Sequence, residues 1–232
     1  MSRRSIAFCV LALVAAGVFA RLGVWQLARL HEKVRRNATI AAQQLQPATP
    51  LAAVPPDTAG AHYRKVTASG RFDYDQEVVW GARTHQGSPG VDLVTPLRIA
   101  GSDSAILVDR GWVYSPDGAS VDRGRWRERD TATITGYIEV YAPDAGVTNV
   151  AREPRLVRRL SRSELSPRIH SPLAPYYLVA TGDSADGAHP ARRALPALDE
   201  GPHLSYALQW FSFAAIALGG AALMYFRERR RV

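Results

Sequence analysis

Cysteine is almost absent from this chain of 232 residues, in which Cys9 is the only one. A single cysteine excludes an intramolecular disulfide and a cysteine-based metal or redox pair. Catalytic signatures are missing as well. The sequence has no Gly-x-Ser-x-Gly elbow, no His-Glu-x-x-His pair, and no glycine pattern for binding phosphates or dinucleotides. These absences predict that the chain is not an enzyme.

Lysine is also scarce, with only Lys33 and Lys65, so arginine supplies nearly all of the formal net charge of +8. The excess is concentrated at the two ends of the chain. Arg3 and Arg4 precede a first apolar run, and a cluster of arginines at 227–232 follows a second. Nucleic-acid binding would require a basic patch on the folded domain. The distribution therefore predicts basic membrane flanks and no nucleic-acid partner.

Two apolar runs are long enough to consider as membrane spans. Residues 205–226 contain no charged side chain, and a helix of that length measures about 33 Å, which crosses a bilayer core. The first run, 6–20, is shorter and resembles a signal-peptide core, with Val18-Phe19-Ala20 as an acceptable cleavage site. The apolar character resumes after Arg21, however, and continues to Ala28. This continuation favours an uncleaved span over 6–28.

The charged flanks of the two spans predict different orientations. The arginines at 227–231 place the C-terminus in the cytoplasm. More cations follow the first span than precede it, which would favour the reverse orientation for that span alone. Long loops translocate largely regardless of their charge, so we expect both termini in the cytoplasm. Only five residues precede the first span, which favours the inner (plasma) membrane of a bacterium with a periplasmic main domain.

Between the spans the hydrophobic pattern changes from helical to strand-like. A helix continues to about residue 46, a proline-rich linker follows, and apolar alternation then recurs in short runs. Strands are predicted at 62–68, 77–83, 91–99, 105–113, 131–141 and 176–180, and weak helices at 121–128 and 163–165. The predicted fold class is a membrane-anchored α+β protein in which two transmembrane helices flank an antiparallel β-barrel or sandwich-like extracytoplasmic domain.

This interpretation divides the chain into seven segments. They are a cytoplasmic N-terminus at 1–5, transmembrane helix 1 at 6–28, a membrane-proximal helix and linker at 29–60, the β domain at 61–182, a return loop at 183–203, transmembrane helix 2 at 204–226 and a cytoplasmic basic tail at 227–232.

The motif Asp109-Arg110-Gly111-Trp112 follows a strongly apolar strand and has two interpretations. In the structural one, Gly111 forms a bulge where the strand ends and Trp112 fills the core. In the functional one, Arg110 pairs with a carboxylate or propionate and Trp112 lines a cofactor. Spacing alone favours the structural interpretation.

The entrance of the second span carries a stripe of three side chains. His203, Tyr206 and Trp210 are spaced i, i+3 and i+7, so a helix places them on one side. Neutral imidazole is a good axial ligand for haem iron, and aromatic rings can pack against a porphyrin. The alternative is an interfacial aromatic belt with a histidine at the helix end, which the residues alone favour.

Small residues predict where the two spans touch. Ala215 and Gly219 form a small-x-x-x-small pair on the second span, and Ala12, Ala16 and Ala20 form a matching ridge on the first. Such pairs allow close packing of helices in membranes.

Four blocks together resemble the Surfeit locus protein 1 family. They are 22–27 (LGVWQL) followed by Arg29 and Lys33, 90–97 (GVDLVTPL), 108–113 (VDRGWV) and 203–211 (HLSYALQWF). They occur in the family's order and cover essentially the whole chain.

The resemblance implies a membrane-bound chaperone for the assembly of haem-copper cytochrome c oxidase in the respiratory chain. It implies help with the insertion of haem a into subunit I, contacts with other assembly factors, and transient haem a binding. His203 would be the axial ligand of the haem iron, Tyr206 and Trp210 the packing residues, and Arg110 a candidate for orienting contacts. The alternative is a structural scaffold that docks on oxidase subunits without binding haem.

Overall fold

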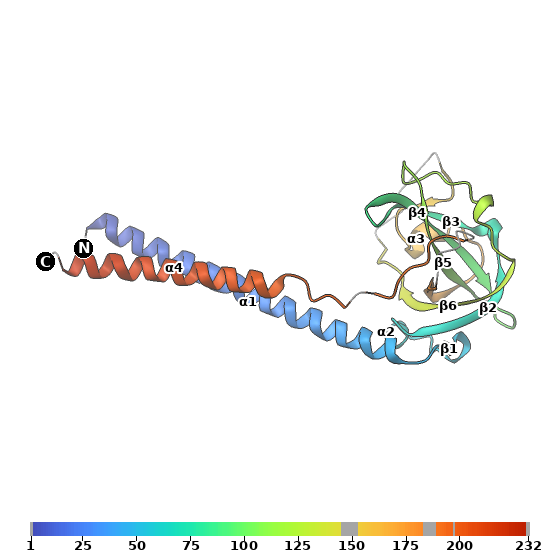
Figure 1. Cartoon of the computed structure of the whole chain (residues 1–232), viewed down its shortest axis with the longest axis horizontal. Helices are drawn as coiled ribbons and strands as arrows, with labels where there is room; N and C mark the ends of the chain where they lie inside the picture. Colours follow the sequence, from blue (N-terminus) through green and yellow to red (C-terminus); the bar gives the residue numbers. More distant parts are fainter. Residues whose placement is uncertain (1, 145–152, 183–188, 197, 231–232) are drawn as a thin grey trace. The chain divides into compact units, whose positions relative to one another are not determined.

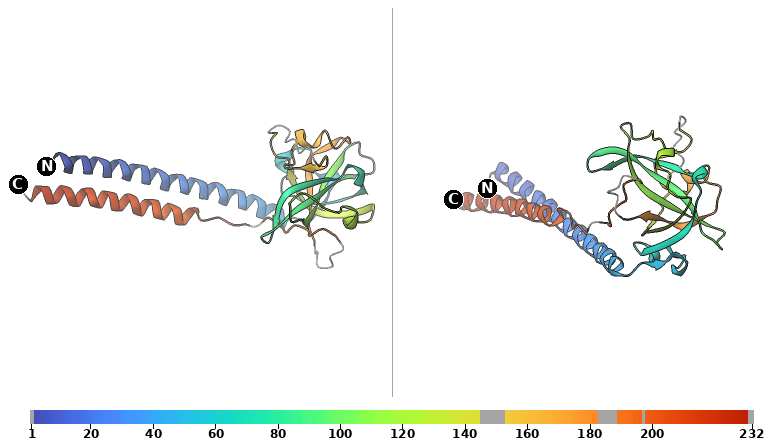
Figure 2. Two further views of the ribbon diagram at one scale, coloured as in Figure 1. Left: turned by 90° about the horizontal axis from the view of Figure 1, so that it is seen from above. Right: turned by 45° about the vertical axis from the view of Figure 1, so that its right-hand side comes forward.

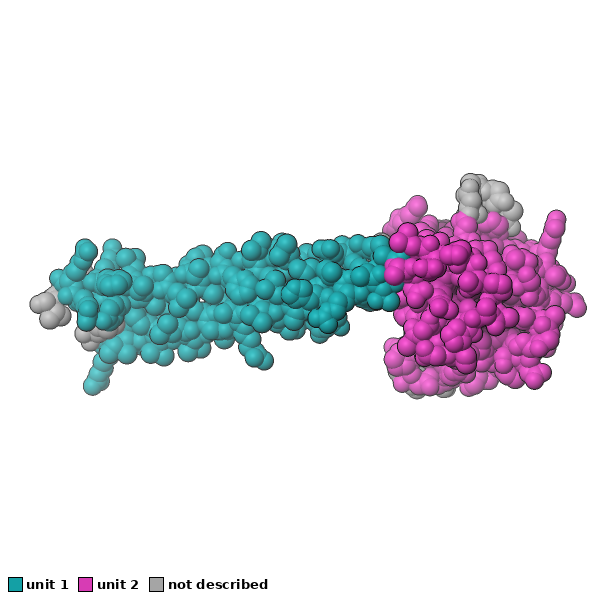
Figure 3. All heavy atoms as spheres, turned by 90° about the horizontal axis from the view of Figure 1, so that it is seen from below, with its two compact units in different colours: residues 1–41, 197–232 teal, residues 42–196 magenta. Residues whose placement is uncertain are grey.

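The computed structural model describes residues 2–144, 153–182, 189–196 and 198–230. It divides into two compact units, one formed by 1–41 and 197–232 and the other by 42–196 (Figure 3). We call them the helical unit and the β unit. Parts of the predicted return loop, at 183–188 and 197, and the end of the predicted basic tail, at 231–232, lie outside the described residues.

The helical unit consists mainly of α1 (Arg3–Leu45) and α4 (His203–Arg229). The two helices run antiparallel and side by side in both views of Figure 2. Each is long and apolar enough to cross a membrane. The predicted continuation of the first helix beyond its span is confirmed, because α1 extends to Leu45 without a break.

Small residues form the contact between α1 and α4. Gly23 is buried, and a Cβ atom there would lie 2.7 Å from the ring of Phe211 on α4. Close approach at this point therefore requires glycine. At the far end of the pair, the Ser5 hydroxyl donates to Glu228 Oε1 at 2.8 Å. The two helices are thus joined by close packing and by polar contacts, of which the bond between Ser5 and Glu228 is one.

The predicted small-residue pair of the second span is wrong in position. Ala215 and Gly219 are exposed, whereas Ala16 on α1 is buried as predicted. The buried small residues of α4 instead repeat every seven positions, at Ala207, Ala214 and Ala221. This repeat follows from the antiparallel helix pair, in which one narrow face of each helix meets the other.

Among its described residues the β unit contains eight strands, some of which are labelled in Figure 1. They are β1 (Thr49–Pro50), β2 (Lys65–Phe72), β3 (Val78–His85), β4 (Ser88–Arg98), β5 (Ala105–Tyr114), β6 (Thr131–Val140), β7 (Leu156–Val157) and β8 (Leu173–Ala180). All six predicted strands are present, and the two-residue strands β1 and β7 are additional. The short helices are α2 (Thr58–Ala61), α3 (Arg162–Leu165) and the 3-10 turns η1 (Leu51–Ala53), η2 (Tyr74–Gln76) and η3 (Gly124–Trp126). The predicted helix at 163–165 corresponds to α3, but that at 121–128 is reduced to η3.

Five strands close into a barrel in the order β2-β6-β8-β5-β4, because β4 also pairs with β2 through Leu97 and Phe72. The fold is therefore a barrel with extra strands. The predicted barrel is confirmed, but its strands are not antiparallel as predicted at every pair, since β5 and β8 are parallel. The chain between them is long enough to return in the same direction, which a parallel pair requires. The short pairs β1–β2 and β3–β7 are parallel as well.

Two apolar clusters explain why β4 is buried along most of its length. One fills the barrel and includes Leu97, Ile106, Ile138 and Leu178, all fully buried. Each such side chain contributes roughly 1.5–3 kcal/mol through removal from water. The other lies around Leu93 and its neighbours on β3, β5 and β7. A strand between two clusters is buried on both faces, and here the buried stretch includes the polar side chains of Asp92 and Thr95.

Candidate functional site

His203 is the first residue of α4, directly after Pro202. Its Nδ1 lies 2.9 Å from Oε1 of Gln26 on α1. An amide oxygen only accepts hydrogen bonds, so Nδ1 carries the proton and donates it to Gln26. Among the described residues, Nε2 has no hydrogen-bond partner. A histidine that donates through one nitrogen and leaves the other nitrogen's lone pair available has the arrangement of a metal ligand.

Trp210 also faces α1. Its ring stacks on Phe19 with the centroids 5.7 Å apart and an interplanar angle of 25°. Phe19 and Gln26 are seven residues apart on α1, so they lie on one face of that helix. His203 and Trp210 have the same spacing on α4, and the two faces contact each other. Sequence reasoning missed Phe19 and Gln26. The available signal was Gln26 itself, a polar side chain within an apolar stretch.

Tyr206 lies on the same side of α4 as the other two but does not join the contact, because it is 46% exposed. The structure thus brings His203 and Trp210 to α1 and leaves Tyr206 beside them. These residues fit a haem that is held by one protein ligand. Within the described part of the chain there is no group of three or more His, Cys, Asp or Glu that could hold a bare metal ion. The site can therefore supply one imidazole and aromatic surface.

Arg110 occupies a β-bulge in β5. Leu93 of β4 pairs with Gly111 and the next residue, Val94, pairs with Asp109, so Arg110 is the extra residue. Gly111 has φ of 121°, a conformation that favours glycine. The bulge predicted from the sequence is confirmed. It also turns the side chain of Arg110 into the β unit.

The guanidinium of Arg110 is fully buried and its donors are directed to groups of the β unit. Its Nη1 donates to Glu77 Oε2 at 2.7 Å, its Nε donates to Glu128 Oε1 at 2.9 Å, and its Nη2 donates to the Trp126 carbonyl. These contacts favour the structural interpretation of Arg110. Trp112 does not fill the core as that interpretation predicted. It is half-buried and its ring lies 5.2 Å from that of His85.

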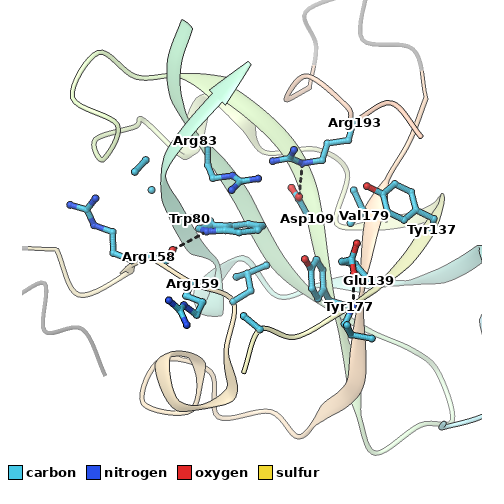
Figure 4. A pocket seen from close by; sticks show the side chains of 15 residues that line it. Trp80, Arg83, Asp109, Tyr137, Glu139, Arg158, Arg159, Tyr177, Val179 and Arg193 are labelled. Atoms are coloured by element: carbon cyan, nitrogen blue, oxygen red, sulfur yellow. Dashed lines mark hydrogen bonds and ion pairs between the residues drawn. The ribbon is translucent and has the colours of Figure 1, made fainter. Parts of the chain in front are cut away.

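A cavity of about 400 Å³ opens on the β unit, between β3, β6, β8 and the segment after β7 (Figure 4). Arg83 and Arg193 line it, and both are held by buried carboxylates. Asp92 accepts from Arg83 Nε at 2.8 Å and from Arg193, and Asp109 accepts from Arg193 Nε at 3.1 Å. These side chains could not be grouped from the sequence, because they are far apart in the chain.

Burial, reinforced by the neighbouring charge of Asp92, raises the pKa of Asp109 to about 7, although Arg193 opposes the shift. The pKa of an aspartate in the unfolded chain is about 3.9. Between these two values the folded protein binds more protons at Asp109 than the unfolded chain does. The contribution of this carboxyl to stability therefore falls as the pH rises through this window.

An Asp109→Asn variant tests this sign, since asparagine retains an oxygen for the Gly111 N–H that Asp109 now accepts. The melting temperature of the variant minus that of the wild type is expected to increase from about pH 4 to about pH 7 and then level off. The measurement is thermal unfolding of the detergent-solubilised chain at a series of pH values. Parallel curves for the two proteins would contradict the raised pKa.

Comparison with known proteins gives a consistent result. The model of the SURF1 family matches residues 13–215. An uncharacterised SURF1-like protein of Mycobacterium tuberculosis is 31% identical over 222 residues, covering 92% of this chain and 81% of the relative. A SURF1-like protein of Drosophila melanogaster is 29% identical over 231 residues, covering 88% of this chain and 73% of the relative.

A shorter match carries a functional name. The cytochrome oxidase assembly protein SHY1 of Saccharomyces cerevisiae is 31% identical over 94 residues, covering 40% of this chain and 24% of that protein. The range matched by the family model, 13–215, includes Gln26, Arg110, His203 and Trp210.

Proposed function

The chain belongs to the SURF1 family, and from this membership we propose that it assists the assembly of haem-copper cytochrome c oxidase. The resemblance noted in the sequence blocks is thereby confirmed as family membership. The yeast relative named as a cytochrome oxidase assembly protein supports the assignment of the process. Oxidase subunits are the expected partners, together with other assembly factors and membrane lipids. We expect a non-enzymatic chaperone with no nucleic-acid partner.

The finer proposal is that the chain holds haem a on its way to subunit I of the oxidase. The observation that carries it is the hydrogen bond between His203 Nδ1 and Gln26, which leaves Nε2 available as an axial ligand for the haem iron. The haem is cargo, and it supplies electron transfer and oxygen chemistry only in the finished oxidase. The chain's own task is to bind it and release it.

The packing roles belong to Trp210 and Tyr206. Tyr206 is exposed beside His203 and is free to contact a porphyrin. Trp210 would have to share its ring between the haem and Phe19, on which it already stacks. Arg110 stays a candidate for an orienting contact, but its donors are occupied within the β unit. We therefore assign ligand and packing roles to the helical unit.

We further propose that both helices span the inner membrane of a bacterium, with both termini in the cytoplasm and the β unit in the periplasm. The length and apolar character of α1 and α4 support two spans, and Arg227 and Arg229 in the last turn of α4 support a cytoplasmic C-terminus. Alkaline phosphatase fused after Gly118 is expected to be active, because this enzyme folds only outside the cytoplasm. The matched control is a fusion after Arg230, which is expected to be inactive. The reverse pattern would overturn the topology.

The competing function is a scaffold that docks on oxidase subunits and never binds haem. The stacking of Trp210 on Phe19 favours it, since that ring already has a partner. The test is the absorption spectrum of the full chain, purified in detergent from cells that make haem a. A haem spectrum in stoichiometric amount supports the carrier. Haem-free protein that copurifies with oxidase subunits supports the scaffold.

A further inference from the structure

We propose that the cavity beside Trp80 on the β unit binds a small organic oxyanion, a molecule that carries a phosphate or carboxylate group. This site is separate from the proposed haem site, and its function does not depend on haem binding. Four arginines are among the residues that line the cavity (Figure 4). Arg83 and Arg193 are half-buried, whereas Arg158 and Arg159 are exposed and form the rim. The four come from three separate segments of the chain, namely β3 (Arg83), the residues after β7 (Arg158 and Arg159) and the segment before α4 (Arg193). We call them the arginine cluster.

A β-bulge brings the first of these arginines into the cavity. Trp80 pairs with Asp92 and Arg83 pairs with Gly90, so β3 advances three residues while β4 advances two. Residues three apart on a regular strand point to opposite faces. The extra residue lets Trp80 and Arg83 face the same cavity. Ala82 takes a φ of 56° to form this bulge, a conformation that costs free energy in a non-glycine residue.

The inner pair of the cluster, Arg83 and Arg193, is held in place before any ligand arrives. Buried Asp92 and Asp109 fix both side chains. The guanidinium of Arg83 also lies over the Trp80 ring, 3.8 Å from its centroid. Among the described residues Arg83 donates only through Nε, so its terminal nitrogens are available to a ligand. A preorganised site of this kind loses little conformational entropy on binding.

The outer pair, Arg158 and Arg159, carries the uncompensated charge. Their backbone N–H groups both donate to Glu164 Oε2, at 2.9 and 3.3 Å. The Arg158 carbonyl accepts from Trp80 Nε1 at 3.2 Å. The backbone at the rim is therefore fixed, whereas within the described chain neither side chain makes a hydrogen bond or ion pair. Both residues line the cavity and are exposed.

The chemistry of these groups selects the ligand. Guanidinium groups match the geometry of phosphate and carboxylate oxygens, which they bind through paired hydrogen bonds. The remaining carboxylate of the lining, Glu139, is already paired with His62, so it does not compete for the cluster. Val179 and Leu160 add apolar wall next to the charged groups, which suits a ligand with an organic body. A cavity of about 400 Å³ lies in the range of small-molecule sites.

Titration calorimetry on the full chain in a neutral maltoside detergent tests the proposal with three probes. Pyrophosphate represents free phosphate compounds, citrate represents carboxylates, and dihexanoyl phosphatidic acid represents a lipid headgroup. The variants are Arg158→Gln and Arg159→Gln. The matched control is Arg129→Gln, which removes the same charge from an exposed arginine of the β unit that does not line the cavity. Because all three arginines are exposed, the three variants are expected to melt at the same temperature as the wild type.

We expect saturable binding of at least one probe, and about tenfold weaker binding in each cavity variant through loss of one charge-assisted contact. The probe that binds most tightly identifies the source of the oxyanion. The control variant should bind like the wild type. Absence of saturable binding for all three probes would overturn the proposal, as would an equal loss of affinity in Arg129→Gln. Neither outcome bears on haem binding, which has its own spectroscopic test.

Discussion

Replacing Arg110 with alanine is expected to lower the free energy of unfolding of the β unit by about 3–5 kcal/mol. The reason lies with its partner. Glu77 is only 1% exposed. Without Arg110 the cation that the described residues leave beside its carboxylate is Arg123, whose Nη1 lies 3.9 Å from Oε1 and whose side chain is partly exposed. Thr95 still donates to Glu77 at 2.6 Å, but one hydroxyl does not replace a buried positive charge. A buried carboxylate without a compensating cation destabilises the folded state by much more than the intact ion pair stabilises it.

Thermal or urea unfolding of the full chain, followed by tryptophan fluorescence, measures this effect. For a unit of this size we expect a fall in melting temperature of about 10 °C. Arg129→Ala, an exposed arginine of the same unit, is the matched control and should change little. The double variant Arg110→Met with Glu77→Leu should recover most of the loss, because it removes both charges at similar volume. An unchanged melting temperature in Arg110→Ala would show that the buried pair is not needed for stability.

Removing the imidazole of His203 is expected to abolish haem binding if the carrier proposal is correct. His203→Ala leaves no axial ligand at this site, so purified protein should lose its haem spectrum. Gln26→Leu should retain a spectrum but weaken haem affinity by about 10–100-fold, as loss of the group that orients a ligating histidine does elsewhere. Gln26→Glu retains an acceptor for the Nδ1 proton and should bind haem nearly as well as the wild type.

Two features make this series decisive. Gln26 lies on α1 and cannot itself ligate iron, so an effect of Gln26→Leu must pass through the orientation or tautomer of His203. Tyr225→Phe, at the opposite end of α4, is the control for effects of substitution and purification that do not involve the haem site. An unchanged haem spectrum in His203→Ala would exclude His203 as the ligand. Equal affinity in Gln26→Leu and wild type would exclude Gln26 as its positioning residue.

The sequence predicted the strands well and the contacts between distant residues poorly. Apolar alternation, as at Ile134, Gly136 and Ile138, reports on a local periodicity that burial enforces, and the six main strands follow it. Gly111 predicts a bulge, because a glycine within an apolar strand often marks one. The strands β1 and β7 have only two residues each. No periodicity can develop over that length, so neither could be predicted.

The partners of the functional side chains depend on tertiary structure. Glu77 and Glu128 lie 33 and 18 residues from Arg110 in the chain, and nothing in either neighbourhood indicates the pairing. Small residues are so frequent on α4 that Ala215 and Gly219 could not be distinguished from the true contact face by spacing alone. His203, by contrast, was identifiable from its position at the end of an uncharged span. Its pairing with Gln26 depends on the antiparallel packing of α1 and α4, which the sequence alone does not specify.

The order of the barrel strands has a consequence for how the chain matures. β8 lies between β5 and β6, although some 60 residues separate it from β5 in the sequence. Until Leu173 and the residues after it arrive, β5 and β6 each present an open edge to any other chain. Pairings of such large sequence separation form slowly, because the loop must close before the contacts are made. If the β unit is exported as proposed, its barrel can close only after nearly all of it has crossed the membrane. In that interval the unclosed sheet is exposed to aggregation through these edges.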